Sequence, residues 1–72
     1  MDLVKVGIRI KELRLKNNIT QEELANKLYI SKQAISKWEN GYCLHDIDNL
    51  EKICCIFNVS IDYILGINKV NQ

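Results

Sequence analysis

The strongest constraint on the fold is a pair of helix-start signals with very little chain between them. Thr20 begins an S/T-x-x-E capping box, and the helix after it is expected to reach Leu28. Ser31 is a favoured N-cap residue, and the helix after it is expected to run from Lys32 to about Asn40. Only two residues separate Leu28 from Ser31. A connection this short predicts two helices packed at a steep angle around a tight turn.

Apolar periodicity and cap signals predict three further helices. The first is expected from about Leu3 to Lys16, and Asn17-Asn18 ends it because Asn tolerates the left-handed conformation. A fourth is expected from about Asp46 to Phe57. A short fifth helix follows Ser60 as its N-cap and ends at Leu65-Gly66. The fold class is therefore expected to be all-α.

The apolar faces of the first four helices predict one core. Its expected members are Val6, Ile10, Leu13, Leu24, Ala25, Leu28, Ile35, Trp38, Ile47, Leu50, Ile53, Cys54 and Phe57. A chain of 72 residues without Pro and with 3 Gly suits one small helical domain. We expect this domain over residues 1–66, followed by a short C-terminal tail over residues 67–72.

The composition indicates neither a membrane segment nor a bound cofactor. No apolar run approaches the roughly 18 residues of a membrane span, and the N-terminus lacks the layout of a signal peptide. The cysteines are odd in number and Cys54 adjoins Cys55, which favours reduced thiols in the cytoplasm over a disulfide framework. A zinc set of Cys43, His45, Cys54 and Cys55 matches no common ligand spacing, so no metal is expected.

Charge is distributed unevenly along the chain. Residues 1–42 carry eight basic and five acidic groups, a net charge of +3, whereas residues 43–72 carry two basic and four acidic groups, a net charge of −2. One end can therefore face phosphates while the other faces away. Asymmetry of this size also arises by chance, so it is weak support for a nucleic-acid partner.

The outward face of the helix after Ser31 carries polar side chains of the kind that read base pairs. They are Lys32, Gln33, Ser36 and Lys37. In the major groove, Gln can hydrogen-bond adenine at two points and Lys can bond the acceptors of guanine. Gln21 and Ser31 stand at helix starts, where backbone N–H groups can hold a phosphate. The pattern alone fits a DNA-reading helix or an ordinary solvated helix face.

Three motifs in the sequence resemble a known family. They are Thr20-Gln21-Glu22-Glu23-Leu24-Ala25, Ser31-Lys32-Gln33-Ala34-Ile35-Ser36-Lys37-Trp38-Glu39-Asn40-Gly41 and Asn58-Val59-Ser60-Ile61-Asp62-Tyr63-Ile64-Leu65-Gly66. Together they look like the Cro/CI-type helix-turn-helix regulators of bacteria and phages, also called the XRE family. The resemblance spans roughly Val6 to Gly66. It implies a compact five-helix, lambda-repressor-like fold and a homodimer that binds double-stranded DNA at a near-palindromic operator.

The resemblance also implies roles for single residues. Gln21 matches a residue that commonly holds a phosphate and braces the recognition helix, and Asn40 matches a frequent phosphate contact. Arg14 and Glu39 match a structural ion pair between the first and third helices, in which a guanidinium–carboxylate fork fixes their placement. The expected DNA-binding residues are therefore Gln21, Ser31, Lys32, Gln33, Ser36, Lys37 and Asn40.

The sequence departs from the family pattern in two places. Family members usually have Gly or Asn at the position of Tyr29, where the backbone often takes a positive φ. A tyrosine there is expected to be strained by about 1 kcal/mol. The loop after Gly41 is often basic in the family, but here it reads Tyr42-Cys43-Leu44-His45, which puts phosphate contacts from this loop in doubt.

A protein-interaction role is the alternative to DNA binding. Ile8, Leu15, Ile56 and Ile61 are expected to face outward, and exposed apolar residues can mark an interface. An antitoxin or a docking module would use such a surface. Self-association would use it equally well, and we expect the dimer interface at Ile56 and Ile61. An enzyme is not expected, because His45 has no catalytic partner set and no glycine-rich phosphate loop exists.

The function expected from the sequence is sequence-specific DNA binding by a transcriptional regulator. Its recognition helix is expected to be the one from Lys32 to Asn40, lying in the major groove. Repression is the expected sign of regulation. The expected location is the cytoplasm, in association with the nucleoid.

Overall fold

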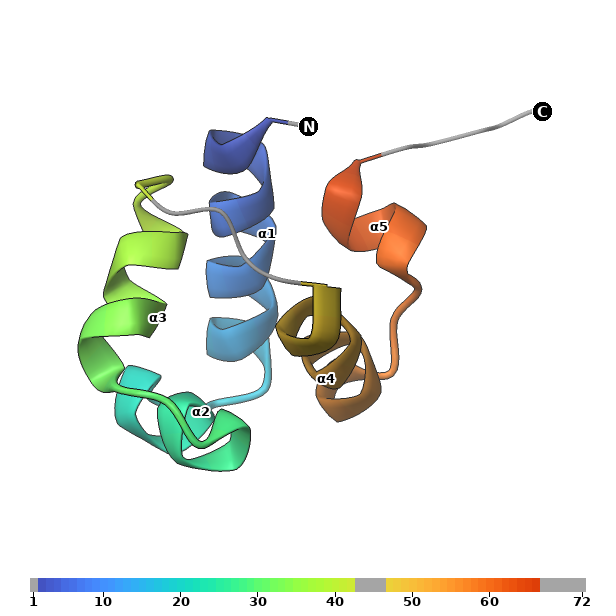
Figure 1. Cartoon of the computed structure of the whole chain (residues 1–72). Helices are drawn as coiled ribbons and strands as arrows, with labels where there is room; N and C mark the ends of the chain where they lie inside the picture. Colours follow the sequence, from blue (N-terminus) through green and yellow to red (C-terminus); the bar gives the residue numbers. More distant parts are fainter. Residues whose placement is uncertain (1, 43–46, 67–72) are drawn as a thin grey trace, which may run out of the picture.

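The described part of the chain is built from helices alone, in the order that the sequence predicts. The structure is a computed structural model, and it describes residues 2–42 and 47–66. Its helices are α1 (Leu3–Lys16), α2 (Gln21–Leu28), α3 (Lys32–Glu39), α4 (Ile47–Phe57) and α5 (Ile61–Leu65) (Figure 1). Within these two ranges there is no strand, and no helix is both long enough and apolar enough to cross a membrane. The expected all-α class is therefore confirmed.

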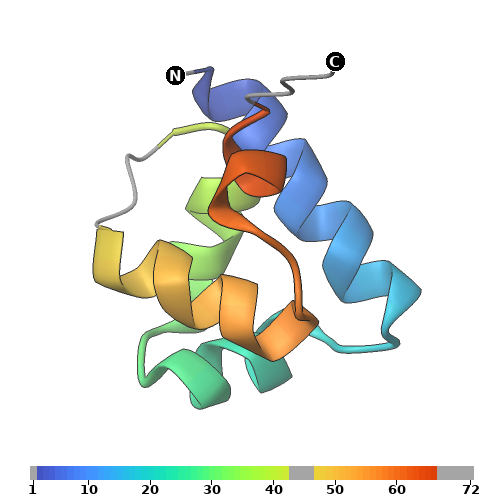
Figure 2. The same cartoon turned by 90° about the vertical axis from the view of Figure 1, so that its right-hand side faces the viewer.

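Helix α1 lies between the other helices in Figure 1, with α3 along one side and α4 and α5 on the other. Contacts join α1 to α3 and α5, α2 to α3 and α4, and α4 to α5. Figure 2 shows α4 and α5 in front of α1 and α3, in agreement with the first view. The outer side of α3 is therefore turned away from α4 and α5, which leaves it open to a large partner.

Side-chain caps set the starts of α1, α2, α3 and α5. The Asp2 carboxylate accepts hydrogen bonds from the backbone N–H groups at the start of α1, a cap that the sequence analysis missed. Thr20, Ser31 and Ser60 each accept a hydrogen bond from the backbone N–H three residues further on, as predicted. Helix α3 ends at Glu39, one residue before its expected end at Asn40.

Residues with positive φ follow or end several of these helices. Asn18 and Asn58 adopt φ values of 58° and 56° after α1 and α4, and Gly41 and Gly66 adopt 77° and 76°. Tyr29 ends α2 in the left-handed region, at φ 58° and ψ 41°. Because it has a Cβ atom, this conformation costs Tyr29 about 1 kcal/mol relative to ordinary helical backbone. The strain predicted for the turn before α3 is therefore present.

The core consists of buried side chains from all five helices. Its members are Val6, Ile10, Leu13, Leu24, Ala25, Leu28, Ile35, Trp38, Leu50, Ile53, Phe57 and Ile64. Cys54 is half-buried at the margin of the core rather than inside it. Ile64 is a core residue that the sequence analysis did not list.

Two of the four residues expected to face outward do not do so. Ile56 and Ile61 are half-buried and pack against the core, because α5 folds back onto α4 and covers its flank. Ile8 and Leu15 do face solvent, with 49% and 55% of their surfaces exposed. The expected dimer interface is thus less accessible than the helical pattern indicated.

Candidate nucleic-acid interface

A buried ion pair joins α1 to the end of α3. Arg14 Nε donates to Glu39 Oε2 at 2.6 Å and Arg14 Nη2 donates to Glu39 Oε1 at 3.1 Å, which makes the forked geometry of a strong guanidinium–carboxylate pair. Both residues are 8% exposed. Arg14 Nη1 also donates to the carbonyl oxygen of Ile19, just before α2, at 3.0 Å. One arginine therefore ties together α1, the start of α2 and the end of α3.

Gln21 extends this network toward the surface. It is the first residue of α2 and is half-buried, and its Nε2 donates to Glu39 Oε1 at 3.0 Å. The resemblance implies that this residue braces the recognition helix, and the contact runs to Glu39 at the end of α3. The sequence did not predict Glu39 as its partner, because the two residues are distant along the chain and share no local pattern.

The outward stripe of α3 is largely open to solvent. Lys32, Gln33 and Lys37 are exposed, whereas Ser36 is half-buried. The Ser31 hydroxyl is used as the N-cap, accepting from the backbone N–H of Ala34 at 3.1 Å. The side chains best placed to reach base edges are therefore Lys32, Gln33 and Lys37, with Ser36 behind them.

Asn40 is exposed at the end of α3, but its side chain turns back onto the helix. Its Nδ2 donates to the carbonyl oxygen of Ser36 at 2.8 Å. This bond occupies one of the two N–H groups of the amide, and the other N–H is able to donate to a phosphate oxygen. Asn40 lies at the end of α3, whereas Ser31 and Lys32 lie at its start. A ligand that contacts both ends must therefore extend along the whole helix.

A depression lies where the starts of α2 and α3 meet. We call it the α2–α3 notch, and it is lined by Arg14, Thr20, Gln21, Glu22 and Lys32. Gln21 and Lys32 supply donors for an anion there. Glu22 opposes an anion, because its carboxylate is exposed at the same edge.

The capping box also carries a charge at the start of α2. The backbone N–H of Thr20 donates to Glu23 Oε1 at 2.8 Å, and this bond is the main reason why the pKa of Glu23 lies below its usual value. The Thr20 hydroxyl and Lys27 lower the pKa of Glu23 further. Glu23 is therefore ionised at neutral pH and stabilises the positive end of the α2 dipole.

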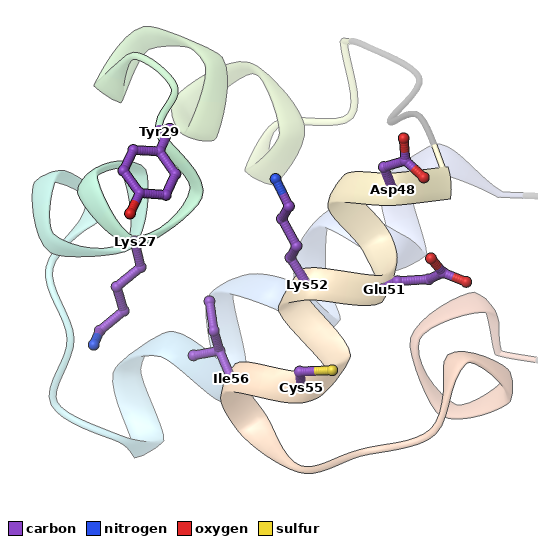
Figure 3. Close-up of a pocket in the computed structure, with 7 residues that line it drawn as sticks. All are labelled: Lys27, Tyr29, Asp48, Glu51, Lys52, Cys55 and Ile56. Atoms are coloured by element: carbon purple, nitrogen blue, oxygen red, sulfur yellow. The ribbon is translucent and has the colours of Figure 1, made fainter.

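A second depression lies on a different part of the surface, between the end of α2 and the outer side of α4. We call it the α2–α4 groove, and Figure 3 shows its lining residues: Lys27, Tyr29, Asp48, Glu51, Lys52, Cys55 and Ile56. Tyr29 is 90% exposed at its rim. The lining mixes both charge signs with apolar surface, so it lacks the uniformly basic character of a surface that binds DNA phosphates.

The thiols of α4 lie beside this groove. Cys54 and Cys55 are free, and Cys55 is the exposed one of the pair. Burial raises the pKa of the Cys54 thiol, and the neighbouring Cys55 and Glu51 raise it further. Cys43 and His45, the other members of the zinc set weighed above, lie outside the described residues. Within the described ranges, no group of three or more His, Cys, Asp or Glu side chains could hold a metal ion.

Comparisons with known proteins identify the family. A family model described as helix-turn-helix matches residues 10–64. The chain is 44% identical over 58 residues to the transcriptional activator BcrR of Enterococcus faecalis, covering 81% of this chain and 28% of BcrR. It is 41% identical over 69 residues to the transcriptional regulator ImmR of Bacillus subtilis, covering 96% of this chain and 54% of ImmR. The antitoxin PezA of Streptococcus pneumoniae is 37% identical over 65 residues, covering 90% of this chain and 41% of PezA.

Solved structures agree with this grouping. The restriction-modification controller protein C.AhdI of Aeromonas hydrophila superposes with a TM-score of 0.80 at 27% identity, over 88% of this chain and 96% of C.AhdI. The biofilm regulator SinR, in a structure with DNA, superposes with a TM-score of 0.75 at 33% identity, over 83% of this chain and 97% of SinR. The chain spans about a quarter of BcrR and about half of ImmR. It belongs to the Cro/CI-type (XRE) helix-turn-helix family of transcriptional regulators.

Proposed function

We propose that this chain is a transcriptional regulator that binds double-stranded DNA sequence-specifically by inserting α3 into the major groove. The observation that carries the proposal is the exposure of the polar residues Lys32, Gln33 and Lys37 on α3. This helix lies on the side of α1 away from α4 and α5 (Figure 1). An α-helix with its side chains is about 10–12 Å across, which suits the major groove with its width of about 12 Å. The proposal assigns no catalytic activity to the chain, which would bind DNA without changing it chemically.

The proposed DNA-binding residues divide into those that read base edges and those that contact phosphates. Gln33 and Lys37 read base edges, because amide and ammonium donors match adenine and guanine in the major groove. Gln21, at the start of α2, and Asn40, at the end of α3, hold phosphates, which positions the helix without reading sequence. Ser31 contributes only the proton of its hydroxyl, because its oxygen already caps α3.

Selection of bound sequences from random duplex DNA tests this function. We expect enrichment of one motif, and binding to it should weaken steeply as salt rises. Gln33→Ala should lose about 1–3 kcal/mol on that motif and keep its affinity for random DNA. Lys11→Ala, at an exposed position on α1, is the matched control and should retain the affinity for the motif. Enrichment of no motif at low salt would refute the proposal.

The chain is proposed to act as a homodimer on a near-palindromic operator. One module of this size reaches only a few base pairs, whereas two modules about 34 Å apart would read an inverted repeat. Ile56 lines the α2–α4 groove and Ile61 lines a neighbouring depression, and the exposed Cys55 lies in the lining of both. This outer side of α4 is the proposed interface.

Stoichiometry on the selected site tests the dimer. Cys55→Lys places a charge on the exposed part of the proposed interface, so we expect one bound copy instead of two, or a clear loss of affinity. Ile61→Lys is less informative, because Ile61 packs against the core and its replacement also affects folding. Leu15→Lys, on exposed α1, should leave two copies in place. A single copy of the unmodified chain per site would eliminate the dimer.

Repression is the proposed sign of regulation, since a module that covers a promoter blocks polymerase without any further contact. A reporter gene placed behind the selected site measures the sign directly. Reporter expression that rises when the chain is supplied would show activation instead, the activity that the name of BcrR states for that relative.

A role as an antitoxin is the second candidate. It is favoured by the similarity to PezA. The α2–α4 groove is the proposed toxin site, because the exposed ring of Tyr29 at its rim is of a kind enriched in protein interfaces. An antitoxin protects its host by binding the toxin, so a variant with Gln33→Ala and Lys37→Ala should still protect. Loss of protection together with loss of DNA binding would count against this role.

A further inference from the structure

The outward face of α1 carries a line of exposed side chains that we call the α1 seam: Val4, Ile8, Lys11 and Leu15. Its three apolar members, Val4, Ile8 and Leu15, are exposed over 57%, 49% and 55% of their surfaces. A spacing of four, three and four residues keeps the seam within about 60° of arc around the helix. This is the spacing with which one helix of a coiled coil packs along another.

A hollow lies in the middle of the α1 seam, and it is lined by Lys5, Ile8, Arg9 and Glu12. These residues stand at positions i, i+3, i+4 and i+7, the arrangement of a hole that receives one side chain from a facing helix. We propose that the α1 seam binds the same seam of a second copy of this chain, with the two helices antiparallel. A two-fold axis beside Ile8 then places Ile8 of each copy over the hollow of the other.

The charges beside the α1 seam determine the direction of packing. Lys5 and Glu12 are exposed and lie on opposite sides of Ile8 along the helix. Neither Lys5 nor Glu12 makes an ion pair within residues 2–42 and 47–66. Antiparallel packing sets Lys5 of each copy beside Glu12 of the other, whereas parallel packing sets like charges together. The seam is therefore complementary to itself in the antiparallel direction.

The contact is expected to be weak and separate from the proposed interface on α4. A standard interface buries about 800 Å² on each partner, and three half-exposed apolar side chains supply only part of that area. Lys11 interrupts the apolar line, because its ammonium group has to stay in water. Two copies joined through α4 would still present one α1 seam each, so the seam allows association beyond a dimer. The contact does not depend on DNA binding and goes beyond the proposed function.

Charge-swapped variants test the α1 seam in the free protein. Lys5→Glu makes both charged positions negative and Glu12→Lys makes both positive, so each variant repels itself and attracts the other. We expect a mixture of the two variants to associate roughly tenfold more tightly than either variant alone. The NMR signals of Ile8 and Leu15 in an isotope-labelled copy should shift as the other variant is added. The double variant Lys5→Glu, Glu12→Lys restores opposite pairs and should associate like the unmodified chain.

A second mixture controls for net charge. Glu22→Lys and Lys32→Glu change the net charge by the same amounts at exposed positions of α2 and α3, and their mixture should gain much less. All of these substitutions are at exposed positions, and melting curves check that each variant is folded. A mixture of Lys5→Glu and Glu12→Lys that associates no more tightly than the control mixture would overturn the proposal. A double variant that associates no better than Lys5→Glu alone would also overturn it, because antiparallel seams require the rescue.

Discussion

Two arginines of α1 face different halves of the molecule and are held in different ways. Arg14 faces α3, where all three of its nitrogens donate hydrogen bonds at 2.6–3.1 Å. Arg9 faces the end of α5, where its guanidinium lies close to Gly66. Arg9 Nη1 is shielded from solvent and has no hydrogen-bond partner among the described residues. The α3 side of α1 is thus held by directional bonds, and the α5 side by shape and apolar burial.

The difference corresponds to the positions of the proposed DNA contacts. A base-reading helix has to be placed to within a fraction of an ångström, and hydrogen bonds fix direction as well as distance. The α1–α3 contact adds a close approach of backbones, since a Cβ on Gly7 would lie 2.2 Å from the carbonyl oxygen of Trp38. The other half meets α1 through α5 and shares the apolar core with it, and burial of that core stabilises the fold without fixing an angle.

Removal of Arg14 should have the largest effect. Arg14→Ala leaves the buried carboxylate of Glu39 without its counter-charge, and breaking such a pair costs about 3–5 kcal/mol. A domain of this size is expected to have only about 4–11 kcal/mol in total, so the variant should be partly unfolded at 37 °C. Chemical denaturation at 25 °C measures the loss.

The double replacement Arg14→Met and Glu39→Met is the informative control. Two well-packed apolar side chains can replace a buried ion pair with little loss of stability. We expect the double variant to be more stable than Arg14→Ala and still to bind the selected site weakly, because Gln21 loses its partner. Full DNA affinity in the double variant would show that the directional bonds are not needed for the interface.

Gly7→Ala should have the next largest effect. Its Cβ would lie 2.2 Å from the backbone oxygen of Trp38 and 2.9 Å from that of Glu39, so α3 has to move away from α1. Overpacking of this kind costs about 1–3 kcal/mol, and here it exceeds the gain in helix propensity of about 1 kcal/mol that Ala usually brings. Lys11→Ala at an exposed site of α1 is the control. A Gly7→Ala variant as stable as the unmodified chain would show that α3 is not tightly placed.

Most of the fold was predictable from the sequence because its signals are local. The capping box at Thr20 and the cap at Ser31 each involve residues within one helical turn of one another. The strained turn at Tyr29 was instead predicted from the family resemblance. Apolar periodicity, which is also a local signal, identified the core. It misplaced Ile56 and Ile61, because their burial depends on how α5 folds back onto α4, and periodicity within one helix carries no information on that contact.

The candidate site was only partly predictable. Residue type and spacing indicated the stripe of α3, and the family resemblance supplied Arg14 and Glu39. The bond from Gln21 to Glu39, the retraction of Asn40 onto Ser36 and the α2–α4 groove are tertiary features without a local signal. The sequence likewise did not predict that Arg14 is fully hydrogen-bonded whereas Arg9 Nη1 has no partner among the described residues.

Replacement of Arg9 should have a small effect, in contrast to that of Arg14. Arg9→Met keeps the packing of the long side chain and removes a buried N–H that has no acceptor in the described part of the chain. Because an unsatisfied buried donor is costly, we expect the stability to stay within about 1 kcal/mol of the unmodified chain and to rise rather than fall. Denaturation of this variant beside Arg14→Met measures the asymmetry. A loss as large as that of Arg14→Met would remove the distinction between the two sides of α1.

The smallest expected effect concerns Glu23. Its hydrogen bonds to Thr20 lie at the start of α2 and do not join two helices, unlike those of Arg14. The folded state lowers the pKa of Glu23 below the ordinary value of 4.5, chiefly through the backbone N–H of Thr20. Its ionised form therefore stabilises the fold above the ordinary pKa, and this contribution is lost as the pH falls through the lowered value. Glu23→Gln should melt at a slightly lower temperature than the unmodified chain at pH 7, and the difference should shrink as the pH falls below about 4.5. Melting curves of both chains from pH 7 to pH 3 measure the difference, and a gap that stays constant over that range would show that the carboxylate does not support the start of α2.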